Sequence, residues 1–127
     1  HHLRHGLPGR HLLHRQLDER DRYRLVKQYP LAGKPPMMTQ VYEGPEGTRI
    51  IAAKGAPEAI LNASHADLRF REVYQSLGSK GYRVLGVARG EWKDTTLPDN
   101  QADFTFTFLG FTVFLDPPKE NIAAVFA

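Results

Sequence analysis

The sequence contains no cysteine among its 127 residues. Without cysteine, the chain has no disulfide scaffold, no thiol nucleophile and no cysteine-based zinc site. Long hydrophobic runs are also missing: the longest uncharged, mostly apolar stretch, Phe104 to Leu115, is too short for a helix that spans a bilayer. No signal peptide is evident. The net charge of +3 is too small to indicate a nucleic-acid partner by itself.

The remaining composition fits one globular domain. Hydrophobic residues make up 41% of the chain and charged residues 24%, which are ordinary values for a protein that folds around a core. A chain of this length buries enough surface to fold alone. It begins with His1 rather than methionine, and residues 122–127 end inside an apolar stretch. We therefore expect the sequence to be a piece excised from a longer protein.

Positive charge is concentrated at the N-terminal end. Residues 1–34 contain eight Lys and Arg against three acidic residues, whereas residues 35–127 contain nine against eleven. Five of the six histidines lie within residues 1–14. Histidines three or four residues apart can bind zinc from one helix face, but no carboxylate has the spacing to complete a site, and Gly6 and Pro8 interrupt a helix. We interpret this stretch as a solvated, partly helical surface segment, with a zinc-binding or polyanion-binding arm as alternatives.

Two helices are expected in the middle of the chain. The first begins at Pro57, because proline suits the first helical position, where its missing N–H costs nothing. The second, from about Ala66 to Leu77, has apolar residues at i, i+4, i+7 and i+11 on one face. Gly78 or Gly81 then suits the end of that helix.

Extended, apolar-rich stretches predict the strands of a sheet on both sides of these helices. A third helix is expected from Lys119 or Glu120 onward, after two prolines that stop the sheet. Strands, then helices, then strands give an α+β fold, with a largely antiparallel, twisted sheet of about six strands and helices packed on it. The predicted strands are residues 23–31, 37–43, 48–53, 82–89, 104–109 and 111–115, with a bulge or kink allowed at Gly110.

No spacing alone forces an enzyme assignment, but some side chains occupy unusual places. Lys54 ends a buried-looking strand before Gly55, where it can lean over the sheet edge while the glycine lets a ligand approach the backbone. Arg83 alternates with the apolar Leu85, so it needs an anionic partner, which is either an internal carboxylate or a ligand phosphate. Tyr29 lies beside a Gly- and Pro-rich break, where it either stacks on a base or packs in the core.

Together these pieces resemble the cytoplasmic nucleotide-binding domain of P-type cation-transporting ATPases. Residues 54–58 read Lys-Gly-Ala-Pro-Glu, which matches a motif of that family at all five positions. Residues 81–88 resemble its segment in which an arginine enters a buried strand. Residues 108–110, followed by a D-P-P-K run, resemble its return to the phosphorylation domain. The resemblance extends from about Tyr23 to the end of the chain, some four-fifths of it.

The resemblance implies that the chain holds the adenosine of ATP while the phosphates reach an aspartate in another domain, with Mg²⁺ taking part in the full-length protein. Lys54 and Gly55 would lie along the adenine and ribose, and Arg83 would pair with the phosphates. The position that stacks on adenine is either Tyr29 or Leu31, depending on how the stretch before residue 39 is aligned. The implied nucleotide-binding residues are Tyr29, Lys34, Met38, Lys54, Gly55 and Arg83.

The resemblance also implies a domain division. Residues 1–115 would be a nucleotide-binding fragment, and residues 116–127 a hinge and the first residues of the phosphorylation domain. Its partners would be ATP and the phosphorylation and actuator domains of the same parent, with no nucleic acid. The sequence has no D-K-T-G-T segment, so we expect ATP binding without hydrolysis. The hinge residues are Asp116, Pro117, Pro118 and Lys119.

The parent would be an integral membrane pump, with this fragment on its cytoplasmic side and outside the membrane. The Lys-Gly-Ala-Pro-Glu form favours pumps for calcium, magnesium or similar cations. The alternative from another class is a non-catalytic interaction module that keeps the fold without binding nucleotide.

Overall fold

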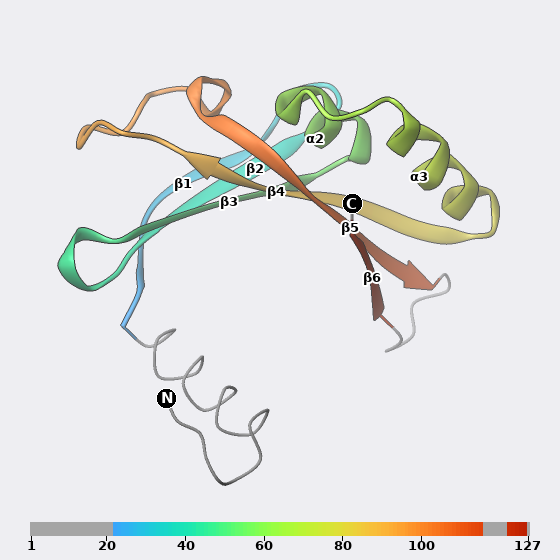
Figure 1. The fold of residues 1–127 in the computed structure, drawn as a ribbon, viewed down its shortest axis with the longest axis horizontal. Helices are drawn as coiled ribbons and strands as arrows, with labels where there is room; N and C mark the ends of the chain where they lie inside the picture. Colours follow the sequence, from blue (N-terminus) through green and yellow to red (C-terminus); the bar gives the residue numbers. More distant parts are fainter. Residues whose placement is uncertain (1–21, 116–121, 127) are drawn as a thin grey trace, which may run out of the picture.

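The computed structural model of the chain describes residues 22–115 and 122–126. It shows a twisted antiparallel sheet with two helices on one face (Figure 1). Two short 3-10 helices, Pro45–Gly47 and Gln101–Asp103, lie in the connections. The helices are α2 (Pro57–Ser64) and α3 (Arg69–Ser79), and the strands are β1 (Arg24–Ala32), β2 (Met37–Glu43), β3 (Arg49–Gly55), β4 (Tyr82–Glu91), β5 (Thr105–Leu115) and β6 (Ile122–Phe126).

The strands lie in the sheet in their order along the chain, from β1 to β6, and each is antiparallel to the next. The predicted α+β class, an antiparallel sheet with helices packed on it, is confirmed. The predicted strand ranges form five strands rather than about six, because β5 runs without interruption through Gly110. In place of a break, the pairing of β5 with β4 has a register irregularity beside Gly110, whose φ is 150°.

The C-terminal end corrects the sequence prediction. A helix was expected from Lys119 or Glu120, but residues 122–126 form β6 and pair with β5 from Phe114 to Gly110. An extended Ile-Ala-Ala-Val-Phe segment gains backbone partners along the open edge of β5, and its β-branched residues suit a strand. The predicted hinge, Asp116 to Lys119, and the histidine-rich residues 1–14 lie outside the described residues.

Both helices in the middle of the chain are confirmed. Pro57 opens α2 as predicted, and the helix ends before His65, which has a left-handed φ of 52°. Helix α3 begins only at Arg69, so Ala66 precedes it, and Val73 is 36% exposed rather than core-facing. The other three residues of the predicted face, Ala66, Phe70 and Leu77, do pack against the core, together with Tyr74.

The main core lies between the sheet, helix α2 and the connection that follows β4. The aromatic ring of Phe104, at the end of that connection, contacts Tyr29, Trp92 and Phe106 with centroid distances of 5.3, 5.6 and 5.9 Å. The connection therefore closes the part of the sheet that the helices do not cover. The buried residues of this core are Tyr29, Val41, Ile51, Ala53, Ile60, Ala88, Phe104 and Phe106.

Candidate functional site

A pocket of about 550 Å³ opens at one end of the sheet. The β1–β2 turn, the junction between β3 and α2, the start of β4 and the end of β5 all contribute to it. Its volume is within the roughly 300–1,000 Å³ of typical small-molecule sites. Only one lining side chain is charged, that of Arg83. The lining residues are Leu31, Pro36, Gly55, Ala56, Pro57, Arg83, Val84, Leu85 and Phe114.

Backbone contact between β2 and β3 builds one wall of the pocket. Gly55 pairs with Met37, and a Cβ placed on Gly55 would lie 2.5 Å from both the Met37 Cα and the Pro36 carbonyl oxygen. Only glycine fits there, because the atoms that a side chain would meet are backbone. The Ala56 N–H also donates to the Pro36 carbonyl, at 2.9 Å. The sequence predicted a glycine that admits a ligand, whereas here Gly55 admits the neighbouring strand and also lines the pocket.

Arg83 supplies the charge of the pocket. It lies on β4 opposite Phe114 of β5, and its side chain is exposed. Within residues 22–115 and 122–126 it forms no salt bridge, so this part of the chain does not provide the internal carboxylate considered from the sequence. A guanidinium at the mouth of an apolar pocket is well placed for an anionic ligand group.

Lys54 is exposed and does not line the pocket. Its cross-strand neighbours are Met38 and Val87, so it shares a sheet face with Arg83, which lies four residues from Val87 along β4. Four residues of strand span roughly 13 Å. A ligand would have to be long to contact both cations. Met38 is half-buried beside Lys54 and is not a lining residue either.

Tyr29 belongs to the core and not to the pocket. Its side chain is 5% exposed, and its hydroxyl donates to the Pro98 carbonyl at 2.5 Å. Burial raises the pKa of the Tyr29 hydroxyl, and the carboxylates of Asp99 and Asp103 raise it further. Of the two residues that the sequence left open at the stacking position, Leu31 lines the pocket, and it is 63% exposed.

Lys34 lies exposed in the turn between β1 and β2 and does not line the pocket. Of the six predicted binding residues, the structure therefore brings only Gly55 and Arg83 into it. Sequence reasoning did not single out Pro36 or Phe114. Nothing in their local patterns could have identified them, because Phe114 reaches the pocket through the pairing of β5 with β4, and Pro36 through the turn that brings its carbonyl against the Ala56 N–H.

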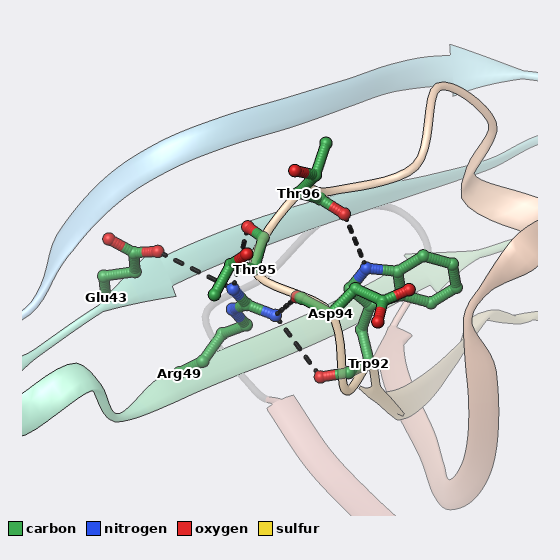
Figure 2. Close-up of polar contacts among 6 residues, drawn as sticks. All are labelled: Glu43, Arg49, Trp92, Asp94, Thr95 and Thr96. Atoms are coloured by element: carbon green, nitrogen blue, oxygen red, sulfur yellow. Dashed lines mark hydrogen bonds and ion pairs between the residues drawn. The ribbon is translucent and has the colours of Figure 1, made fainter.

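Another arginine organises the opposite end of β3, as Figure 2 shows. The Arg49 guanidinium donates to the carbonyls of Trp92, Asp94 and Thr95 at 3.3, 2.9 and 3.4 Å, and it lies 4.0 Å from a Glu43 carboxylate oxygen. The Trp92 indole N–H donates to the Thr96 carbonyl at 2.9 Å. These bonds fix the connection after β4, so the Arg49 guanidinium is already hydrogen-bonded within the chain.

Neither a metal cluster nor a membrane span occurs in the described part of the chain. Residues 22–115 and 122–126 bring no three His, Asp or Glu side chains together as metal ligands. No helix in the same residues is long and apolar enough to cross a membrane.

No family model matches the chain, but comparison with known proteins finds similar sequences. The chain is 32% identical over 115 residues, 81% of its length, to the plasma membrane ATPase of Zygosaccharomyces rouxii. It is 30% identical over 110 residues, 74% of its length, to the sodium/potassium exporting P-type ATPase of Schizosaccharomyces pombe. The calcium-transporting ATPase of Bacillus subtilis is 29% identical over 115 residues, 79% of the chain.

This chain is homologous to a segment of P-type ATPases. It spans 10–13% of the length of these three relatives. Two of the segments that carry the P-type ATPase resemblance, residues 54–58 and 81–88, supply walls of the pocket. Residues 108–110, which belong to the third segment, do not line it.

Proposed function

We propose that this chain is the nucleotide-binding part of a P-type cation-transporting ATPase, and that its pocket holds the adenosine of ATP. The observation that carries the proposal is the convergence of two segments, Gly55 to Pro57 and Arg83 to Leu85, on one pocket. Apolar walls with a single cation suit a ligand that joins a flat ring to an anionic group. A purine nucleotide has both parts.

The pocket suggests a role for each lining side chain. Arg83 would pair with the phosphates, because its planar guanidinium can donate two parallel hydrogen bonds to phosphate oxygens. Leu31 and Leu85 would hold the purine ring by apolar contact. Leu31 is preferred to Tyr29 because the Tyr29 ring packs against Phe104 in the core. Such apolar contact removes the faces of the ring from water.

The remaining predicted residues are less well placed to contact the ligand. Lys54, Lys34 and Met38 do not line the pocket, so they would contact only nucleotide atoms that project from it. Lys54 is the best placed of the three, since it directly precedes Gly55 on β3. Its proposed place is along the ribose, on the face that also carries Arg83.

In the whole protein we propose that residues 1–115 bind the nucleotide, and that Asp116 to Lys119 lead into the phosphorylation domain. The phosphorylation and actuator domains of the same parent would be its partners, and Mg²⁺ would accompany ATP there. The segment would lie on the cytoplasmic side of a membrane pump for calcium, magnesium or a similar cation. Catalysis in such pumps would depend on an aspartate outside this segment, so the chain would bind ATP without hydrolysing it.

Titration of the 127-residue chain with ATP, followed by backbone amide NMR, tests the proposal. Saturable shifts are expected at Gly55, Ala56 and the start of β4 at millimolar ATP, and amides near Arg49 serve as the internal reference. Adenosine without phosphates should bind more weakly, because it lacks the group that Arg83 would contact. If the pocket amides do not move at millimolar ATP, the proposal fails.

One observation favours the second candidate, a non-catalytic interaction module. The core-facing position of Tyr29 leaves the pocket without an aromatic side chain on the β1–β2 turn. Under this alternative, Arg83→Ala and Lys54→Ala leave the response to ATP unchanged, since none is present. Under the nucleotide proposal, Arg83→Ala weakens ATP binding while the fold is retained.

A further inference from the structure

The connection between β4 and β5 contains a side chain that reaches the wall of the pocket. Gln101 lies in this connection, and its side-chain Nε2 donates to the Met37 carbonyl at 3.1 Å. Its Oε1 accepts a hydrogen bond of 2.7 Å from the Thr39 hydroxyl. Thr39 is fully buried, so this hydroxyl has no access to water. One amide therefore holds two points of β2 that are two residues apart.

The first of these points continues directly into the pocket. Met37 follows Pro36, which lines the pocket and whose carbonyl accepts the Ala56 N–H at 2.9 Å. Met37 also lies against Gly55, where there is no room for a side chain. A displacement of the Met37 carbonyl would be transmitted to this wall, because closely packed backbone segments do not move independently.

We propose that Gln101 is a positioning residue for the pocket: it fixes the Pro36–Met37 wall against Gly55 and Ala56, and thereby sets the affinity for the ligand. The identity of the ligand, ATP, rests on the proposed function. A glutamine suits this place because its amide donates to one group and accepts from another at the same time. A glutamate has the same shape but, when ionised, only accepts, so its carboxylate would face the Met37 carbonyl unfavourably.

The experiment compares ATP dissociation constants of the 127-residue chain and three variants. Gln101→Glu should raise the Kd by about tenfold, which is the effect of losing one part-buried hydrogen bond and leaving its acceptor unpaired. Thr39→Ser retains the hydroxyl and should stay within about twofold of the parent. Arg49→Lys loosens the same connection at its other end, so it should lower the melting temperature without changing the Kd.

An unchanged Kd in Gln101→Glu would overturn the proposal. An equal rise in Arg49→Lys would do so as well, because it would show that general loosening of the connection is sufficient. If the parent chain does not bind ATP, the proposed function fails, and hydrogen exchange then tests Gln101 without ligand. The Ala56 amide should exchange faster in Gln101→Glu while the Thr48 amide, which bonds Pro45 at the other end of β3, is unchanged; equal acceleration of both amides would overturn the positioning role.

Discussion

Arg49 and Arg83 lie at opposite ends of the sheet and differ in what their guanidinium groups contact. Arg49, at the start of β3, is surrounded by three backbone carbonyls and a carboxylate from its own chain. Arg83, at the start of β4, is exposed at a pocket and forms no salt bridge within residues 22–115 and 122–126. The first guanidinium stabilises a loop, whereas the second is available to a ligand. Hydrogen-bond partners, and not residue type, separate a structural arginine from a candidate binding one.

The largest effect is expected from Gly55→Ala, which disturbs the backbone packing at the pocket end of the sheet. The new methyl group would meet the Met37 Cα and the Pro36 carbonyl at 2.5 Å, and neither can move aside as a flexible side chain could. We expect a loss of about 3 kcal/mol in the free energy of unfolding, at the upper end of overpacking costs. Urea denaturation measures it.

Gly47→Ala is the control variant. Its new methyl group would meet no atom within 4 Å, although the φ of 74° at this position adds some strain. If Gly55→Ala lowers the free energy of unfolding no more than Gly47→Ala does, then β2 moves aside at the pocket to make room for the methyl group.

The next effect is on binding and separates the two arginines directly. Arg83→Gln should weaken ATP binding by about 2 kcal/mol, since it removes charge-assisted hydrogen bonds to the phosphates. The free energy of unfolding should change by less than about 0.5 kcal/mol, as is usual for exposed side chains. Calorimetric titration with ATP, together with urea denaturation, measures both quantities.

Arg49→Gln is the matched variant and should show the reverse pattern. Its guanidinium contacts lie partly exposed at the protein surface, so we expect a loss of about 1–2 kcal/mol in unfolding free energy. The ATP affinity should stay within about twofold of the parent. A large loss of ATP binding in Arg49→Gln, or of stability in Arg83→Gln, would remove the distinction between the two ends.

Local patterns predicted the elements of the fold better than they predicted the site. Pro57 identified the start of α2, and alternating apolar residues identified most of the sheet, because both signals act within a few residues. Residues 122–126 were predicted as a helix and form a strand, because a short apolar run is compatible with either. What decides between them is the open edge of β5, which is a tertiary feature.

The predicted site depended on residue types, and only some of its residues line the pocket. Arg83 was singled out because it stands among apolar strand residues, and it lines the pocket. The stacking position was left open between Tyr29 and Leu31, because a Gly- and Pro-rich break does not show which way the preceding strand faces. The register irregularity between Tyr29 and Ala32 turns Leu31 to the pocket, and such irregularities depend on pairing with β2. Phe114 lies in the site because it pairs with Arg83, and Pro36 because it directly precedes Met37, which pairs with Gly55.

The smallest expected effect is a pH dependence of the connection after β4, which Arg49 holds at Asp94 and Tyr29 holds at Pro98. Burial raises the pKa of Tyr29 above its ordinary 10.0, so the folded state favours the neutral phenol more than the unfolded chain does. This contribution to stability is present below pH 10 and is lost as the pH rises through the folded-state pKa.

Urea denaturation between pH 8 and pH 11 should therefore show the free energy of unfolding decreasing at the alkaline end. Tyr29→Phe, which cannot ionise at this position, should show a smaller decrease, although it starts lower because the bond to the Pro98 carbonyl is gone. Equal alkaline slopes for Tyr29→Phe and the parent would show that Tyr29 does not link pH to the stability of this connection.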